Sequence, residues 1–464
     1  MRLQKIKRCL TIFLAFSLLF AILIGCASTP TDSPTTANQP ATPAEQPAAA
    51  ADPQAPATAA EPAGEEIVLT FITWAEQERI VAQEELNAKF TEMHPNIRVV
   101  VDRPSGYRER LYAMIAAGTP PDIFFQQEML PPTDAANGIM EPMDAYIAAD
   151  DSFNLDELFP ALLEPFIIDG RLYVIPSVTY ASILYYNKDL FDAANLEYPN
   201  DDWTWNDYLD AAKALTIVEG GRTMQYGATV DMLVNFYLPW VFSNGADLIS
   251  PDRTQFVMNS PEGVEAIQFL RDLVYLHEVA PTPTTNVADG VQAFTFQTGM
   301  IGMEVMGSWM TTTYDTSEFN YGIAKIPKSP RTGMRVPMAY PNGYAMSSSG
   351  SNKDAAWTYI SYAASREGQE ILAQTGLGMP TNIEVANSDL FIKSSPVADL
   401  SVVVDSMAIA KGPITTARWG EIGEGASSII TMLGDEIFLN LRDTKEALDE
   451  MKVRIDAILA ELAS

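Results

Sequence analysis

The chain has 464 residues, 47% of them hydrophobic, and a formal net charge of −31 at pH 7. This length is sufficient for two sizeable hydrophobic cores. The charge argues against nucleic acid or an anionic lipid surface as a partner, because phosphate groups would repel so acidic a protein.

Residues 1–25 are predicted to be a lipoprotein signal peptide. Basic residues up to Arg8 precede the apolar run Leu10–Ile24, which is short for a permanent membrane anchor. The run leads into Leu-Ile-Gly-Cys26, which resembles a bacterial lipobox, in which the cysteine is acylated and the chain is cut before it. An uncleaved signal anchor is the alternative. We therefore expect lipidation at Cys26 and a position on the outer face of the cell membrane.

Cleavage before Cys26 would alter both the charge and the cysteine content. It would remove Cys9 and four basic residues, which changes the net charge from −31 to −35. Cys26 would remain as a single, lipidated cysteine, so no disulfide is expected in spite of export. His94 and His277 alone make a poor set of metal ligands. We expect neither a metal nor a cofactor.

Residues 26–64 are predicted to be a disordered tether behind the lipidated cysteine. Of the 38 residues from Ala27 to Gly64, 27 are Ala, Pro or Thr, and none is Val, Ile, Leu, aromatic or basic. Such a composition cannot bury a core. Folded sequence therefore begins near Glu66.

Strands and helices alternate in the first folded part. Strands are predicted at 67–74, 97–101 and 121–125, and helices at 76–93 and 107–117. This alternation favours a mostly parallel sheet with helices on both faces. Ligands of such sheets bind at the carboxyl ends of the strands, which here are Thr73–Gln77 and Gln126–Met129.

The segment Gly170–Phe191 is interpreted as a connection between two α/β units. Its apolar run Ile183–Tyr186 predicts a buried strand, and Asn187 has the position of a helix cap. A strand that runs from one unit into the other would act as a hinge.

The remaining elements restart the α/β pattern near residue 178 and again near residue 340. Thr204 and Asp207 predict a capped helix to Leu215, and Ser260 with Pro261 predicts the start of another. Further predictions are strands at 226–230, 301–306, 321–327 and 343–347, and helices at 291–296, 353–374 and, behind a Thr444 cap, to the C-terminus. Both units are therefore expected to be discontinuous in sequence.

Several segments resemble, in order, the extracellular solute-binding proteins of bacterial ABC importers, the family that contains maltose-binding protein. They are the lipobox, FITWAEQE, GTPPDIFF with NGIMEPMDAYI, LYYNKDLFDAANLEYPNDDWTWNDYLDAAKALT, and FQTGMIGMEVMGSW leading to YGIAKIPKSP. The resemblance covers about 66–464. It implies an α/β, two-lobed type II periplasmic-binding-protein fold, with lobe one at 66–178 and 340–376, lobe two at 182–337 and 380–464, and about three crossings between them.

The resemblance also implies a function. A monomeric binding protein of this kind closes its lobes on a mono- or oligosaccharide and delivers it to the permease of an importer. Contacts from both lobes exist only in the closed state, so ligand shifts the population toward closure. No enzymatic activity is expected.

A sugar site needs aromatic rings that cover C–H faces and polar groups that pair with hydroxyls. Trp309, after a strand end and a Gly-Ser turn, is the leading candidate, and the family's main stacking aromatic falls in this segment. The other candidate ligand contacts are Trp74, Glu76, Gln126, Glu128, Tyr180, Asp231, Trp240, Asn342, Tyr344, Arg418 and Trp419. Packing in the core or a solvated loop is the alternative for each of them.

Other functions are weighed against sugar binding. A secreted carbohydrate-active enzyme would need two carboxylates at a set separation, and the chain shows no G-x-S-x-G, P-loop or H-E-x-x-H motif. The same scaffold could instead bind a polyamine, which suits the acidic balance, or a glycerol phosphate or ferric iron. The sequence leaves these ligand classes open.

Overall fold

The computed structural model describes residues 66–74, 77–231, 233–282, 287–288, 291–292, 295–376, 378–423 and 427–463. All of them belong to one compact unit. The predicted signal peptide, Cys26, the tether and Glu76 lie outside the described residues.

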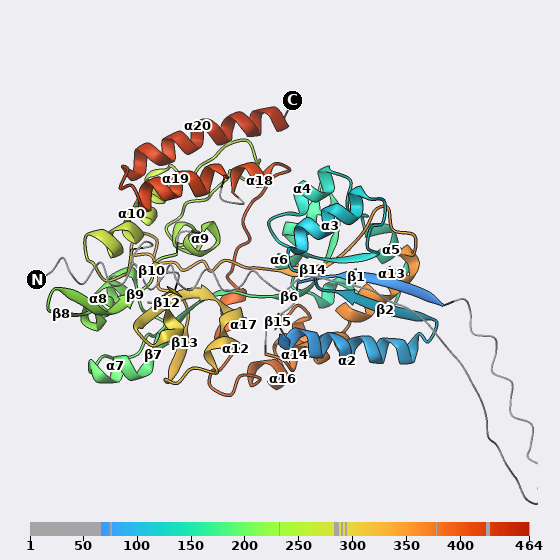
Figure 1. Cartoon of the computed structure of the whole chain (residues 1–464), viewed down its shortest axis with the longest axis horizontal. Coiled ribbons are helices and arrows are strands. Elements are labelled where there is room, and N and C mark those ends of the chain that lie inside the picture. The colour runs from blue at the N-terminus through green and yellow to red at the C-terminus, as the bar shows by residue number, and fades with distance from the viewer. Residues whose placement is uncertain are drawn as a thin grey trace, which may run out of the picture. The chain divides into compact units, whose positions relative to one another are not determined.

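The first sheet carries lobe one and has six strands in the order β15-β6-β14-β3-β1-β2 (Figure 1). β1 pairs in parallel with β2 and β3, whereas β14 pairs antiparallel with both β3 and β6. In Figure 1, the helices α2 and α14 lie below this sheet and α3 and α4 lie above it. The strands are β1 (Ile67–Ile72), β2 (Ile97–Asp102), β3 (Ile123–Gln127), β6 (Val174–Thr179), β14 (Asn342–Met346) and β15 (Met379–Pro380).

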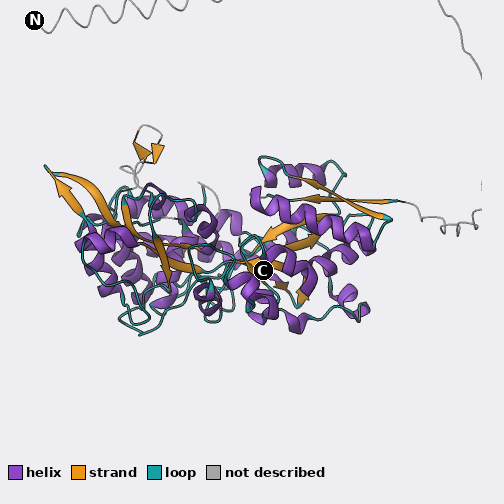
Figure 2. Cartoon of the chain, turned by 90° about the horizontal axis from the view of Figure 1, so that it is seen from below, coloured by secondary structure: helices purple, strands orange, loops and turns teal. Residues whose placement is uncertain are grey.

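The second sheet carries lobe two and has five strands in the order β13-β7-β12-β9-β8. β9 pairs in parallel with β12, and β7 pairs antiparallel with both β12 and β13. Figure 2 shows helices on both sides of the strands in each lobe. The strands are β7 (Ser182–Asn187), β8 (Ile217–Glu219), β9 (Arg222–Ala228), β12 (Ile301–Gly307) and β13 (Tyr321–Ala324).

The two-lobed α/β class is confirmed, but the sheets are mixed rather than mostly parallel. Parallel pairing follows from strand-helix-strand units, as between β1 and β2. β14 reaches lobe one from lobe two, so it meets its neighbours from the opposite direction. The crossings between the lobes thus account for the antiparallel pairs of β14 and β7, whereas β8 and β9 form an antiparallel hairpin within lobe two.

The longer helices pack on the sheets and on one another, and short helical turns fill the connections. The helices are α2 (Gln77–Met93), α3 (Tyr107–Ala116), α4 (Pro131–Ala136), α5 (Asp144–Ala149), α6 (Pro160–Leu163), α7 (Lys188–Ala193), α8 (Trp205–Leu215), α9 (Val234–Ser243), α10 (Pro261–Tyr275), α12 (Thr311–Tyr314), α13 (Lys353–Ala364), α14 (Arg366–Ala373), α15 (Ile383–Ala386), α16 (Asp389–Ile392), α17 (Ser401–Met407), α18 (Trp419–Ile422), α19 (Ile429–Phe438) and α20 (Thr444–Leu462). The short 3-10 turns are η1 (Leu155–Glu157), η2 (Glu164–Phe166), η3 (Phe296–Thr298) and η4 (Ser308–Met310), and two small hairpins are formed by β4 (Ile167–Ile168) with β5 (Arg171–Leu172) and by β10 (Val287–Ala288) with β11 (Val291–Gln292).

Three segments lie side by side in the hinge region, and two of them are crossings between the lobes. The first crossing joins β6 to β7, and the second leads from β13 to β14. The backbone N–H of Tyr340 donates to the carbonyl of Tyr180 (2.9 Å), and that of Ala339 donates to the carbonyl of Lys411 (3.0 Å). These bonds tie the two crossings and the segment after α17 into one hinge region.

The lobe boundaries near the C-terminus remain a prediction, and the contacts bear on them. β15 pairs with β6 in the lobe-one sheet, and α15 and α16 pack on α14. α17 is the next helix along the chain, and it packs on β7 of lobe two. The passage into lobe two therefore lies between α16 and α17.

Local helix signals that were read from the sequence are present in the structure. The Asn187 side chain accepts from the backbone N–H of Leu190 (3.2 Å) and caps α7. Thr204 and Asp207 form a capping box at α8, and Ser260 caps α10 with Pro261 in its first turn. Caps depend on neighbouring residues alone, which explains this agreement.

Three predicted helices differ from the structure. The helix expected at 353–374 breaks at Ser365, whose extended backbone and side-chain cap start α14. The last helix is capped by Asp443, whose carboxylate accepts from the N–H of Glu446 (3.0 Å), so Thr444 is its first residue. The helix expected at 291–296 is absent among the described residues, which place β11 and η3 there.

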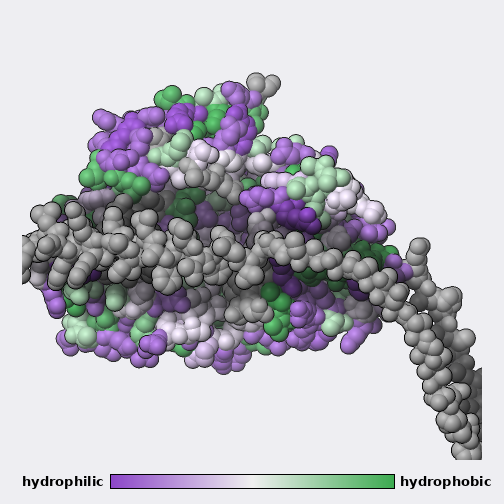
Figure 3. All heavy atoms as spheres, in the orientation of Figure 1, coloured by the Kyte–Doolittle hydropathy of each residue, from purple (hydrophilic) through white to green (hydrophobic). Residues whose placement is uncertain are grey.

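Hydrophilic residues predominate on the face that Figure 3 shows, with apolar residues scattered among them.

The interior is strongly aromatic. In lobe one, Phe71 packs against Tyr344 (5.5 Å between ring centroids) and Phe125 (6.4 Å). In lobe two, Tyr185 packs against Tyr314 (4.9 Å). Ring clusters of this size contribute a large share of the buried apolar area.

Gly343 marks the close approach of β14 to β6, where their pairing register shifts. A Cβ atom there would lie 2.1 Å from the carbonyl oxygen of Ile175. We expect Gly343→Ala to destabilise the fold by about 2 kcal/mol, because the backbone must move. Gly434→Ala in α19 is the matched control, since its Cβ would meet no atom within 4 Å and alanine favours helix. Urea unfolding measures both variants; equal stabilities would contradict the expectation.

Candidate functional site

The lobe-one edge of the candidate site is formed where β1 and β3 end. Asn342, at the start of β14, lies opposite Gln127 at the end of β3. Trp74 follows β1 and is half-buried, with its ring edge-on to Tyr107 (5.0 Å) and Phe125 (5.2 Å). The Tyr107 hydroxyl donates to the Phe125 carbonyl, which fixes the ring beneath Trp74. Trp74 thus follows a strand end, as expected, and Asn342 lies beside the end of β3; their contact with a ligand remains a prediction.

The lobe-two edge centres on Trp309, which follows β12 in the short turn η4. Its half-buried ring folds back over Gly307, where an added Cβ would lie 1.8 Å from the Trp309 Cζ3 atom. Tyr180 and Tyr340 meet the ring nearly at right angles, with centroids at 5.5 Å and 5.0 Å, and Phe236 approaches to 6.1 Å. We call these four residues the Trp309 box.

The hydroxyl of Tyr340 fixes this residue within the Trp309 box. Its hydroxyl donates to the carbonyl of Asn235 in α9 (2.8 Å) and lies 3.0 Å from the Ser182 hydroxyl in β7. Burial raises the pKa of Tyr340 above its ordinary value, and the carboxylates of Glu128 and Asp231 raise it further. Glu128, which is 4% exposed, follows a lobe-one strand and Asp231 a lobe-two strand, so carboxylates of both lobes act on Tyr340.

Glu304 is a buried carboxyl in the strand that carries Trp309. It accepts a hydrogen bond from the Tyr314 hydroxyl. Burial raises the pKa of Glu304 to about 7, the bond from Tyr314 lowers it, and the charge of Asp231 raises it again. Asp231 itself is half-buried and accepts from the N–H of Leu233 (2.8 Å). The carboxylate of Asp231 thus acts on both Glu304 and Tyr340.

Trp240 and Tyr344 lie inside single lobes, which corrects their expected place at the ligand site. Trp240 is 6% exposed and packs against Trp205 (5.6 Å) and Tyr208 (5.3 Å). Tyr344 is 1% exposed in the lobe-one aromatic cluster. Neither ring offers a face to a ligand in this structure.

The Gln126 side chain is also buried within lobe one, where it is hydrogen-bonded to another residue. It is 1% exposed, and its amide donates to Asp134 in α4 (2.5 Å). Asp134 accepts from the Tyr112 hydroxyl as well (2.8 Å), and burial raises the pKa of Asp134. Gln126 therefore anchors α4 to β3, which corrects its expected place at the ligand site.

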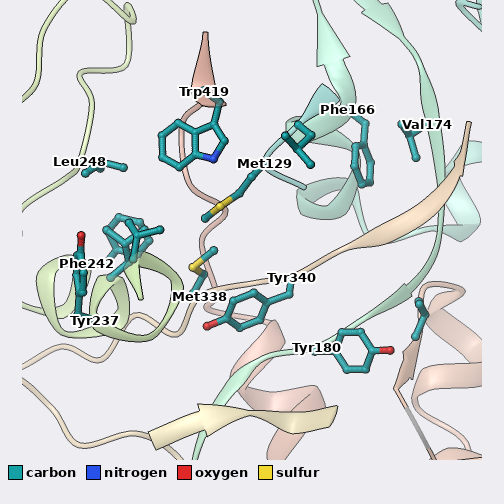
Figure 4. Packing of buried hydrophobic residues seen from close by; sticks show 14 of the residues in the cluster. Met129, Phe166, Val174, Tyr180, Tyr237, Phe242, Leu248, Met338, Tyr340 and Trp419 are labelled. Atoms are coloured by element: carbon teal, nitrogen blue, oxygen red, sulfur yellow. The ribbon is translucent and has the colours of Figure 1, made fainter. Parts of the chain in front are cut away.

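Arg418 and Trp419 are adjacent in sequence, but their side chains lie in different surroundings. The Arg418 guanidinium pairs with Glu421 (2.5 Å) and with Glu461 in α20. Trp419 is fully buried, and Figure 4 shows its ring among Met129 and Met338 of the same apolar cluster. Trp419 thus packs where side chains of lobe one and of the second crossing converge, and Arg418 is held by lobe-two carboxylates.

Tyr340 and Phe236 belong to the site but were not predicted from the sequence. Tyr340 directly precedes Pro341 in the second crossing, and Phe236 lies in an apolar run that forms α9. An aromatic residue at a crossing between lobes is the signal that could have identified Tyr340. Phe236 carries no such signal, because its neighbours in the run are core residues.

The described part of the chain contains no group of three or more His, Cys, Asp and Glu residues that could hold a metal ion. Within the same residues, no helix is long and apolar enough to cross a membrane. What the site offers is a fixed aromatic platform beside carboxylates and amides. This combination suits a neutral or cationic ligand with hydroxyl or amine donors.

Comparison with known proteins gives a consistent result. A sequence model of the family described as bacterial extracellular solute-binding protein matches residues 75–370. The maltotriose-binding protein of Pyrococcus abyssi is 22% identical over 356 residues, which cover 74% of this chain and 73% of that protein. The arabinooligosaccharide-binding protein of Halalkalibacterium halodurans is 32% identical over 126 residues, 27% of either chain.

The fold recurs in solved structures. An ABC substrate-binding protein from Listeria monocytogenes, in complex with cycloalternan, superimposes with a TM-score of 0.77 at 23% identity. The superposition covers 85% of this chain and 100% of that one. At this identity the likeness establishes the two-lobed architecture.

Proposed function

Because the chain belongs to the bacterial extracellular solute-binding protein family, we propose that it captures a sugar between its two lobes and delivers it to the membrane permease of an ABC importer. The observation that carries the proposal is the Trp309 box at the hinge, with Glu128 and Asp231 acting on it from opposite lobes. An aromatic platform covers the C–H face of a pyranose, and carboxylates accept its hydroxyls.

Closure of the lobes would complete the site. Trp74 and Asn342 belong to lobe one and Trp309 to lobe two, so a ligand that touches all three lies between the lobes. Such a ligand binds the closed state better than the open one, and it shifts the population by that difference in affinity. The names of relatives that bind maltotriose and arabinooligosaccharides support a saccharide as the ligand class.

The location forms a further part of the proposal. Cys26 would carry the lipid, and residues 27–64 would act as the tether that holds a monomeric binding protein on the outer face of the cell membrane. The Ala/Pro/Thr-rich composition supports an extended tether. The protein would have no catalytic activity of its own, so a bound oligosaccharide would be recovered intact.

Isothermal titration with a panel of sugars, polyols, polyamines and glycerol phosphates tests the ligand class. We expect at least one mono- or oligosaccharide to bind with a Kd in the micromolar range or tighter, an order-of-magnitude expectation. That sugar should also raise the free energy of unfolding, by about 2.7 kcal/mol when its free concentration is 100 times its Kd. Binding of polyamines or glycerol phosphates alone would refute the sugar class while retaining the binding-protein fold.

A further inference from the structure

The Trp309 ring has little support from its own element. η4 comprises three residues and follows β12 directly. The ring therefore depends on its neighbours: Gly307 beneath it, and Tyr180, Tyr340 and Phe236 around it. A platform for a sugar must hold one orientation, because a ring that turns freely loses entropy on binding.

Tyr340 is held in the Trp309 box by hydrogen bonds of both its backbone and its side chain. Its backbone N–H is bonded to Tyr180 in the first crossing. Its hydroxyl reaches Ser182, at the start of β7, and the carbonyl of Asn235 in α9. Tyr340 is 4% exposed, so these bonds form out of contact with bulk water, where a lost partner is costly. Through its backbone and its side chain, Tyr340 thus connects both crossings, α9 and Trp309.

We propose that Tyr340 is a positioning residue, which holds the Trp309 ring in its ligand-binding orientation and ties that orientation to the crossings between the lobes. The contact between the Tyr340 and Trp309 rings sets the orientation of Trp309. The two contacts of the Tyr340 hydroxyl hold the Tyr340 ring in place. Because the Tyr340 backbone is bonded to the first crossing, a hinge movement that changes the crossings also moves the support of Trp309. The ligand part rests on the proposed function, whereas the orientation of the ring is a property of the free protein.

The variant Tyr340→Phe keeps the ring of residue 340 and removes the hydroxyl. Tyr321→Phe is the matched control, because Tyr321 is also buried in lobe two. Its hydroxyl donates to Asp315 (2.6 Å) and to the carbonyl of Thr311 (3.4 Å), and its ring packs on Tyr185 and Tyr314, all outside the Trp309 box. Both proteins are labelled with 5-fluorotryptophan. The Trp309 resonance is assigned in the ¹⁹F spectrum by its absence from Trp309→Phe.

In the ligand-free protein, Tyr340→Phe is expected to shift or broaden the Trp309 resonance, and Tyr321→Phe is expected to leave it unchanged. With maltotriose as the probe, Tyr340→Phe should bind about tenfold more weakly than wild type, and Tyr321→Phe within about twofold. Ser182→Ala removes one partner of the Tyr340 hydroxyl and should change the same resonance in the same direction. If Tyr340→Phe fails to fold, the Ser182→Ala variant tests the same role of the Tyr340 hydroxyl.

Two results would overturn the positioning role: an unchanged Trp309 resonance in Tyr340→Phe and Ser182→Ala, or the same change in Tyr321→Phe. A changed resonance with unaltered maltotriose affinity would refute the link to the ligand. If wild type binds no sugar of the panel, the proposed function fails, and the ¹⁹F comparison still decides the role of Tyr340.

Discussion

Trp309→Ala is expected to weaken sugar binding by about 30-fold or more while lobe two remains folded. The ring is half-buried and lies in a short turn at a strand end, so its removal takes away a contact surface more than a core. Truncation of an aromatic anchor at the centre of an interface typically costs more than about 2 kcal/mol, and each 1.4 kcal/mol is a tenfold change in Kd. Titration calorimetry with the sugar that wild type binds best measures the loss.

Trp240→Ala provides the contrasting variant. Trp240 lies 6% exposed among the rings of Trp205, Tyr208 and Phe269, so its loss should lower the free energy of unfolding by about 3–5 kcal/mol. Affinity in the protein that remains folded should change little. If Trp309→Ala behaves in this way instead, with unfolding and normal affinity of the folded fraction, then Trp309 is a core residue and the proposed site is wrong.

The contrast between these two tryptophans shows where sequence reasoning ends. Each lies near the end of an apolar run, Trp240 before a turn and Trp309 after one. The run around Trp240 forms the helix α9, and the Trp240 ring faces α8 and α10. The run before Trp309 forms a strand that ends at the hinge. Partners distant in sequence decide which ring stays accessible, and a single sequence does not reveal them.

The same limit applies to the sheets and to the polar candidates. The caps at Asn187 and Thr204 were predictable because their partners lie three residues away. The antiparallel pairing of β14 depends on how the chain re-enters lobe one after more than 150 residues in lobe two, and no local pattern encodes that direction. The sequence predicts a cleft position for Gln126 because this residue follows the expected strand at 121–125, whereas its partner Asp134 lies one element further on.

Glu304→Gln is expected to remove a large pH dependence of stability. Burial raises the pKa of Glu304 from an ordinary 4.5 to about 7, so between these values the folded protein retains a proton that the unfolded chain releases. The folded state then binds more protons than the unfolded state, and stability falls as pH rises through this window. At 1.36 kcal/mol for each pKa unit, ionisation of this buried group costs about 3 kcal/mol by pH 8.

Urea unfolding from pH 4.5 to pH 8 tests this expectation as a difference between two profiles. Glutamine can still accept from the Tyr314 hydroxyl but cannot ionise, so the stability of Glu304→Gln relative to wild type should rise with pH by about 3 kcal/mol. Glu109→Gln, on the exposed side of α3, should run parallel to wild type throughout. Asp231 acts on Glu304 with the same sign of charge, so Asp231→Asn should reduce the wild-type slope without abolishing it. Parallel profiles for Glu304→Gln and wild type would mean that Glu304 is ionised in the folded protein already at low pH, and that its burial is compensated by neighbours.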